Sequence, residues 1–383
     1  MLDRRSFLIR TTLATLAAGS VSPMAFARAA TERRFVFIIQ RGAADGIGMI
    51  MPVGDPAYGA VRHQFLEDAT AGVKLDSMFT LHPALSTAAA LFQKRQALFV
   101  HSVASPYRDR SHFDGQNVLE TGGAAAYQTR DGWMNRLLSL LPQDGNRAIA
   151  VSATVPAALR GNHEVASYAP SVLPDASDDL LHRVTMLYQG DAQLHALWGE
   201  AMDTRRLAGD LAEGSGREAA ATGALAAQLL APSDGARIAM IETGGWDTHS
   251  AQRARLANGL KNLDAMLAAL QSGLGPLWQQ TLVLVATEFG RTVAVNGTGG
   301  TDHGTGTAAM LFGGGVRGGR VVADWPGLAA AQLYEGRDLR PTTRLDDVMS
   351  GAISAHFGLD PERTGAVLFP AIGRRAPMAG LVA

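Results

Sequence analysis

Short apolar runs alternate with amphipathic segments along most of the chain, and this alternation restricts the fold more than any other feature. The runs at 35–39, 97–100, 238–241 and 281–286 are continuous and rich in β-branched or aromatic residues, which is typical of strands buried on both faces. The segment 255–274 repeats leucine at helical spacing. Strands that alternate with such helices predict an α/β fold, a mainly parallel sheet sandwiched by helices.

Further elements follow from the same patterns. We expect strands at 147–153, 307–316 and 319–325, the last two near the sheet edge, and helices at 111–122, 130–142 and 342–359. Residues from about 162 to 230 are rich in alanine, leucine and charge, and they predict a helical insertion that could cover a site. The expected domain therefore spans 31–383 and carries an insertion at about 162–230.

The first 30 residues have the features of an export signal. The pair Arg4 and Arg5 precedes a weakly apolar stretch, and two Ala-x-Ala sites follow at 25–27 and 27–29. This pattern predicts a twin-arginine signal peptide, recognition by the twin-arginine export machinery, and a periplasmic or otherwise exported protein. The apolar stretch is too short and polar for a stable membrane span.

Composition narrows the chemistry. The net charge of −1 gives no basic excess for nucleic acid. The chain has no cysteine, so it forms no disulfide and offers no thiolate to a metal. Any metal site must use histidine, carboxylates or neutral oxygens.

Carboxylates and imidazoles follow the expected strands in five separate segments. Because parallel strands end at one edge of a sheet, we expect these loops to converge. Such a mixed donor set suits a divalent cation. The side chains are Asp45 in RGAADG, His112 in RSHFDGQ, Asp247 and His249 in GGWDTH, Glu288 in TEFGRT, and Asp302 and His303 in TDHGTG.

Several of these residues have simpler local explanations. Asp45 could be a turn residue before Gly46, and Ser111 could cap a helix with Asp114. His112 could be a packed core histidine, and Glu288 could form a local ion pair with Arg291. Two features are more specific. Asp247 and His249 lie two residues apart and so point the same way in an extended loop, and His303 lies in a glycine-rich loop with little packing around it.

The motifs together resemble the DUF1501 family of exported proteins of unknown function, over essentially the whole chain, and that family resembles a distant branch of the alkaline phosphatase and sulfatase superfamily. The resemblance implies a metal ligand at Asp45, a nucleophile at Ser111, and further ligands at Asp247, His249, Glu288 and His303. It also implies one or two divalent ions, Zn, Mg, Mn or Ca. The histidine expected after Glu288 is Phe289 here, and His112 or Asp302 could take its place.

The resemblance therefore predicts an exported metal-dependent hydrolase of phosphate or sulfate esters, acting on a small-molecule or polymer substrate. Ser111 would attack the ester, and Arg110 or Arg291 would neutralise the developing charge. The alternative is a non-catalytic binding or assembly protein on a degenerate scaffold of this kind. A carbohydrate hydrolase with two unassisted carboxylates is a weaker possibility.

Overall fold

The computed structural model describes residues 32–142, 148–169, 184–191, 194–199, 219–373 and 376–383. The expected signal peptide at 1–30 lies outside these residues. Among the described helices, none combines the length and the apolar character that crossing a membrane requires.

A mixed sheet forms the centre of the molecule. Its strands lie in the order β11 (Arg320–Val322), β5 (Ala97–Ala104), β10 (Thr307–Phe312), β9 (Thr281–Ala286), β1 (Arg34–Gln40), β8 (Ile238–Thr243), β6 (Ala148–Val151) and β7 (Val165–Ser167). A further strand, β12 (Thr343–Arg344), also pairs with β5. All pairings are parallel except those of β10, which is antiparallel to both β5 and β9. The predicted mainly parallel sheet is confirmed.

The position of β10 differs from the expectation. We expected the strand near the sheet edge, but it lies in the interior between β5 and β9 and is fully buried. Its residues after Thr307 are all apolar, which fits a strand covered on both faces. The strand β11 does lie at the edge, as expected.

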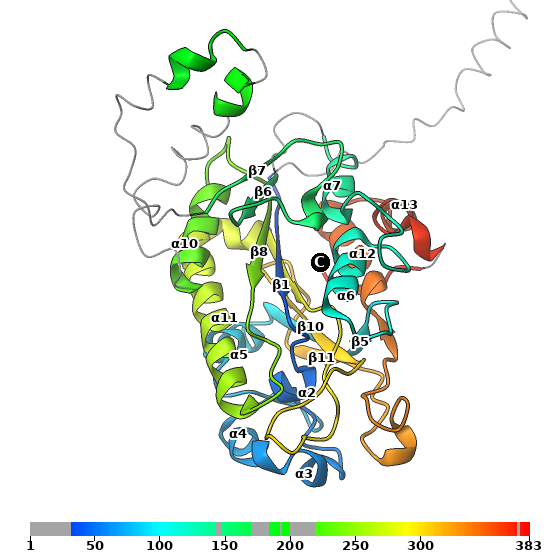
Figure 1. Cartoon of the computed structure of the whole chain (residues 1–383). Helices are drawn as coiled ribbons and strands as arrows, with labels where there is room; N and C mark the ends of the chain where they lie inside the picture. Colours follow the sequence, from blue (N-terminus) through cyan, green and yellow to red (C-terminus); the bar gives the residue numbers. More distant parts are fainter. Residues whose placement is uncertain (1–31, 143–147, 170–183, 192–193, 200–218, 374–375) are drawn as a thin grey trace, which may run out of the picture.

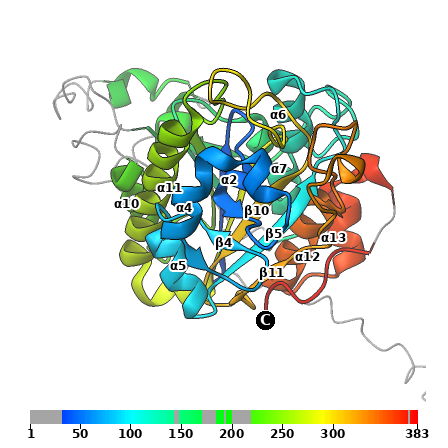
Figure 2. The ribbon, with the colours of Figure 1, turned by 90° about the horizontal axis from the view of Figure 1, so that it is seen from below.

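Helices cover both faces of the sheet (Figures 1 and 2). One face packs on α5 (Ser86–Gln93), α10 (Ala219–Leu230) and α11 (Gln252–Leu274). The other packs on α7 (Trp133–Leu138), α12 (Leu345–Phe357) and α13 (Pro361–Leu368). Along β1, Val36 and Ile38 face the first layer, and Phe35, Phe37 and Ile39 face the second, as the alternation of a strand requires.

Shorter elements join these layers. A small antiparallel sheet has the order β2 (Ile50–Met51), β4 (Thr80–Leu81) and β3 (Val73–Lys74). Further α-helices are α2 (Gly46–Met49), α3 (Tyr58–Val61), α4 (Leu66–Ala71) and α6 (His112–Thr121). Short 3-10 helices are η1 (His63–Phe65), η2 (Ala157–Leu159), η4 (Gly275–Gln280), η5 (Ala330–Gln332) and η6 (Pro370–Ile372).

The segment 162–230, which we expected to be a helical insertion, is described only in part. Its described start includes a strand, β7, which extends the sheet beside β6. Its described end is α10, which packs along α11 as part of the main helical layer. The described ends of this segment therefore belong to the α/β body. Between them, residues 184–188 and 194–199 are helical, and residues 170–183, 192–193 and 200–218 lie outside the described part.

The carboxyl ends of β1, β5, β8 and β9 lie at one edge of the sheet, near α2 in the lower part of Figure 1. Because β10 runs in the opposite direction, it begins at this same edge. The loop before β10 therefore meets the loops after the other strands. This topology brings residues from distant parts of the sequence together.

Candidate metal centre

Three side chains from different loops meet at this edge. One ligand atom from each of His112, Asp247 and His303 lies within 4.8 Å of the other two, and this is the group among the described residues that could hold a metal ion. His249 adds a fourth, because its Nε2 lies 3.0 Å from His303 Nε2 and 3.0 Å from Asp247 Oδ1. His303 Nε2 lies 3.3 Å from the same oxygen.

The other ring nitrogen of each histidine contacts an oxygen. His112 Nδ1 lies 2.8 Å from Glu288 Oε1, His249 Nδ1 lies 3.2 Å from Asp302 Oδ1, and His303 Nδ1 lies 2.9 Å from the Arg110 carbonyl oxygen. A carbonyl or carboxylate oxygen accepts, so we assign the proton of each neutral ring to Nδ1. Each Nε2 then presents a lone pair to the centre, which is the arrangement of metal-binding histidines.

The spacing of the donor atoms fits a metal ion. A tetrahedral zinc ion with bonds of about 2.0–2.1 Å separates its ligand atoms by about 3.3 Å. Four pairs of donor atoms have similar separations: His249 Nε2 to His303 Nε2 (3.0 Å), both of these atoms to Asp247 Oδ1 (3.0 and 3.3 Å), and His112 Nε2 to Asp247 Oδ2 (3.4 Å). In addition, His112 Nε2 is buried and has no hydrogen-bond partner. A buried polar atom without a partner is unfavourable unless something else, such as a cation, satisfies it.

His112 packs against Phe289, the residue that follows Glu288. His112 begins α6, and its ring stacks on Phe289 with ring centroids 5.1 Å apart. Phe289 occupies the position after Glu288 at which the resemblance implied an imidazole. An imidazole from α6 therefore lies beside this position, with its Nδ1 2.8 Å from Glu288 Oε1.

Close backbone packing brings His303 to the centre. A Cβ on Gly300 would lie 2.1 Å from the backbone of His249, and one on Gly304 would lie 2.4 Å from the backbone of Arg291. Both positions therefore need glycine, because the loop lies directly on its neighbours. The loop pairs with the segment after β9 through bonds such as Gly304 N to Gly290 O, 2.8 Å. The glycines of TDHGTG thus have a structural role.

The surroundings favour the deprotonated forms of Glu288, Asp247 and His303. Burial is the largest influence on Glu288 and Asp247 and would raise their pKa values, but several hydrogen bonds and nearby charges, first among them those of His112 for Glu288 and of Arg291 for Asp247, together outweigh it and lower both pKa values. Burial, followed by the nearby His112, lowers the pKa of His303. The hydrogen bond to Glu288 raises the pKa of His112, so a metal ion must displace a proton there.

Three predicted ligands lie outside the inner group. Glu288 is fully buried, and its Oε1 also accepts from the amides of Gly42 (2.8 Å) and Ala43 (3.1 Å). Asp302 contacts His249 and Asn296. Glu288 and Asp302 each contact a histidine Nδ1, and neither belongs to the group of His112, Asp247 and His303. Asp45 is separate: Arg62 and Gln252 bind both of its oxygens.

The predicted catalytic residues have mixed positions. The Arg110 side chain pairs with Asp338 and Glu335. Its backbone carbonyl oxygen contacts His303 Nδ1. Arg291 Nη1 donates to Asp247 Oδ1 at 2.7 Å, which differs from the local pair with Glu288 that we considered. Ser111 is the N-cap residue of α6, but its side chain makes no capping hydrogen bond. Both guanidinium groups already form ion pairs with carboxylates, Arg110 with Asp338 and Arg291 with Asp247.

Sequence reasoning missed the residues that support Asp247. The Thr301 hydroxyl accepts a hydrogen bond from Arg291 and donates one to Gln252, so the contacts of Arg291 extend into the interior. Arg62 pairs with Asp45. Nothing in local sequence distinguishes a buried threonine or glutamine of this kind from an ordinary one. The one available signal was the position of Thr301 beside Asp302 and His303.

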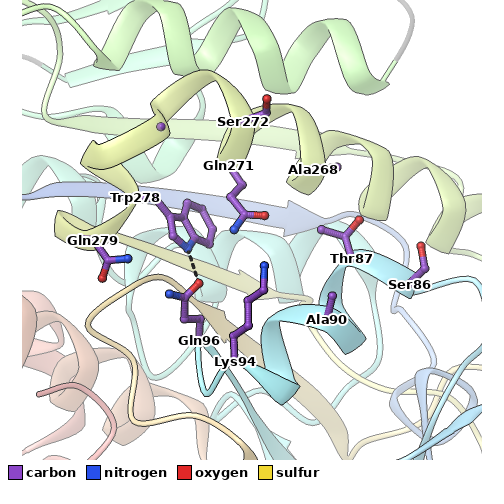
Figure 3. Close-up of a pocket in the computed structure, with 11 residues that line it drawn as sticks. Ser86, Thr87, Ala90, Lys94, Gln96, Ala268, Gln271, Ser272, Trp278 and Gln279 are labelled. Atoms are coloured by element: carbon purple, nitrogen blue, oxygen red, sulfur yellow. Dashed lines mark hydrogen bonds between the residues drawn. The ribbon is translucent and has the colours of Figure 1, made fainter.

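A pocket of about 710 Å³ lies elsewhere in the described part of the chain (Figure 3). It opens between α5 and the end of α11, and Trp278 of η4 donates to Gln96 Oε1 at its wall. None of the converging residues lines it. The chemistry of the donor atoms, rather than pocket size, therefore identifies the candidate site.

Comparison with known families assigns the chain. The family described as "Protein of unknown function (DUF1501)" matches residues 32–367, which is most of the sequence. The chain belongs to the DUF1501 family. This match confirms the resemblance to DUF1501 that the sequence motifs indicated. A comparison with curated proteins finds no match.

Three solved structures illustrate what this DUF1501 member is similar to in fold. The C-terminal periplasmic domain of EcEptC from Escherichia coli, in complex with Zn, has a TM-score of 0.35 and 9% identity, covering 75% of each chain. The phosphonate monoester hydrolase of Agrobacterium radiobacter has a TM-score of 0.37 and 11% identity, and the match covers 76% of this chain and 70% of the hydrolase. Alkaline phosphatase from the Antarctic bacterium TAB5 has a TM-score of 0.35 and 12% identity, and the match covers 74% of this chain and 92% of the phosphatase.

Proposed function

We propose that this chain is an exported metal-dependent hydrolase of phosphate or sulfate esters. The observation that carries the proposal is that the Nε2 atoms of His112, His249 and His303 lie 3.0–3.4 Å from the Asp247 carboxylate oxygens, each with its Nδ1 held by another oxygen. Imidazole-rich sets of this kind suit zinc and similar borderline ions, whereas Mg²⁺ and Ca²⁺ prefer oxygen ligands. We therefore propose one borderline divalent ion held by His112, Asp247, His249 and His303.

The position of the site suits turnover. The side chains of Asp247 and His249 are 42% and 46% exposed, so a substrate can approach the bound ion from solvent. Because the four proposed ligands would complete a tetrahedral zinc site, an ester oxygen would have to enter as a fifth ligand, an expansion that catalytic zinc sites allow. When bound, the ion would supply Lewis acidity toward an ester oxygen and lower the pKa of a hydroxyl or water.

The chain itself supplies the candidate nucleophile. Ser111 directly precedes His112 at the amino end of α6, where the helix dipole favours an anionic substrate. In the proposed reaction the Ser111 oxygen forms a bond to phosphorus or sulfur, and the alcohol of the ester leaves. Water then hydrolyses the covalent intermediate and regenerates the hydroxyl.

Metal-loaded and metal-free protein, offered a panel of phosphate mono- and diesters and sulfate esters, test this proposal. We expect turnover by the metal-loaded protein alone, and its loss in a His303→Ala variant. Protein that holds its metal but hydrolyses none of these esters would contradict the hydrolase and favour the non-catalytic binding or assembly protein.

Export is a separate part of the proposal. It rests on Arg4, Arg5 and the Ala-x-Ala sites, because residues 1–31 lie outside the described part of the chain. Replacing both arginines with lysine should leave the protein in the cytoplasm, as measured by cell fractionation. Unchanged export of that variant would contradict use of the twin-arginine route.

A further inference from the structure

We infer that Asp45 is a positioning residue, joined to Asp247 by a buried chain of hydrogen bonds. We also infer that the Arg62 guanidinium fills the place beside Asp45, so that the chain holds one divalent ion rather than two. The inference rests on the metal centre of the proposed function. It does not require that the centre hydrolyse an ester.

The contacts of Arg62 leave no place for a cation at Asp45. Arg62 Nη1 donates to Asp45 Oδ2, and Nη2 lies 3.1 Å from Oδ1, so both carboxylate oxygens are paired. The guanidinium also donates to the carbonyl oxygens of Thr292 (2.9 Å) and Val293 (2.6 Å). Its exposed fraction is 0%, and that of Asp45 is 1%. A metal ion there would have to displace a buried, always charged group from several hydrogen bonds.

A continuous chain leads from Asp45 to the metal centre. The Gln252 amide donates to Asp45, and its Oε1 accepts from the Thr301 hydroxyl. Since that hydroxyl has a single hydrogen, it accepts from Arg291 Nε at 3.1 Å. Arg291 Nη1 then donates to Asp247 Oδ1 at 2.7 Å.

The polarity of this chain fixes the orientation of each member. A carboxylate can only accept, so the NH₂ of Gln252 must face Asp45 and its oxygen must face Thr301. Gln252, Thr301 and Arg291 are at most 1% exposed, and a broken bond there leaves a buried group without a partner. Asp247 itself is half-exposed on a loop, so the orientation of Arg291 decides where its carboxylate lies.

The Thr301 hydroxyl allows a selective test. A Thr301→Val variant keeps the shape and the backbone carbonyl that binds Arg291, but it removes the link between Gln252 and Arg291. A Thr301→Ser variant keeps the hydroxyl. Thr281→Val is a matched control, because Thr281 is 1% exposed, donates to Leu277 O, and begins β9 at the opposite edge of the sheet.

The measurement is calorimetric titration of the metal-free proteins with Zn²⁺, together with their metal-free thermal midpoints. We expect one ion per wild-type chain and about tenfold weaker binding by Thr301→Val, in line with losses seen when groups behind a ligand are removed. Thr301→Ser and Thr281→Val should bind like the wild type. If Thr301→Val does not fold, Gln252→Met breaks the same chain one residue further from Asp247 and should give the same loss.

Each result decides between the claims. Two ions per wild-type chain would overturn the assignment of Arg62. Unchanged affinity in Thr301→Val, or an equal loss in Thr281→Val, would overturn the positioning role while leaving the proposed function intact. Normal titrations with no ester turnover would overturn the proposed function alone, and a wild-type protein that binds no Zn²⁺ would overturn both.

Discussion

His249 Nε2 and His303 Nε2 face each other across 3.0 Å, although the residues lie 54 positions apart in the sequence. With both Nδ1 protons engaged elsewhere, the two facing nitrogens carry lone pairs. Such lone pairs repel unless a proton or a cation lies between them. The proposed ion would account for this contact, with both nitrogens as its ligands and Asp247 Oδ1, 3.0 Å and 3.3 Å away, as a third.

Removing the charge of Glu288 should weaken metal binding. Glu288 accepts from His112 Nδ1 at 2.8 Å, so Glu288→Gln loses the anion that orients this ring. We expect the affinity for Zn²⁺ to fall by about 10- to 100-fold, measured by competition with a chelator. Asp302→Asn, at an exposed carboxylate 3.2 Å from His249 Nδ1, should lose less. Equal affinities in all three proteins would contradict these roles.

Ser111→Ala should separate catalysis from stability. The Ser111 side chain makes no capping hydrogen bond, so the free energy of unfolding should change by less than about 0.5 kcal/mol, below the usual cost of losing a cap. Ester turnover should disappear while the metal remains bound. The measurements are urea unfolding, metal content and turnover, and full ester hydrolysis by the variant would exclude Ser111 as the nucleophile.

Two glycines of the connection between β9 and β10 should respond differently to replacement by alanine. A Cβ at Gly304 would lie 2.4 Å from the Arg291 backbone, whereas a Cβ at Gly297 would meet nothing within 4 Å. We expect Gly304→Ala to displace His303, to lower the free energy of unfolding by about 1–3 kcal/mol and to weaken Zn²⁺ binding. Gly297→Ala should match the wild type in both unfolding free energy and Zn²⁺ affinity. The same wild-type values in Gly304→Ala would contradict the close packing of this loop.

Two buried histidines away from the centre should make the fold sensitive to acid. Burial lowers the pKa of His101 to about 4 and that of His356 to about 3, from 6.5. The unfolded chain therefore binds protons below pH 6.5 that the folded chain does not take up. Stability is fully present above that pH and falls as pH decreases toward the folded pKa values. Each histidine should cost about 2 kcal/mol of unfolding free energy between pH 7 and pH 5.

Urea unfolding of the metal-free protein at the two pH values measures this loss. A His356→Gln variant can still donate to the Arg34 carbonyl that His356 Nε2 contacts at 2.9 Å, but it cannot titrate. Between pH 7 and pH 5, the unfolding free energy of this variant should fall by about 2 kcal/mol less than that of the wild type. Identical pH dependence in the two proteins would contradict a buried neutral His356.

Periodicity predicted the layers well because it reports directly on burial. The continuous apolar run at 35–39 and the leucine repeat of 255–274 became β1 and α11. Periodicity did not place β10, because an interior strand and an apolar edge strand look alike before pairing is known. It also missed β7, a strand of three residues in a segment of helical composition.

The site was predictable in its residue types and only partly in their roles. Strand ends indicated where His249 and His303 would meet, because topology brings those loops to one edge. The sequence could not show that Arg62, 17 residues after Asp45, would pair with it. Nor could it show that His112 would take the imidazole position beside Phe289, since that depends on how α6 packs. Ion pairs and ring stacking between distant segments are set by tertiary structure.

The most direct test of the central claim is anomalous diffraction at the zinc absorption edge from crystals of Zn²⁺-loaded protein. We predict one anomalous peak, at about 2.0–2.2 Å from the Nε2 atoms of His112, His249 and His303 and from Asp247. A peak beside Asp45, or no peak at the three histidines in protein loaded with zinc, would contradict the account.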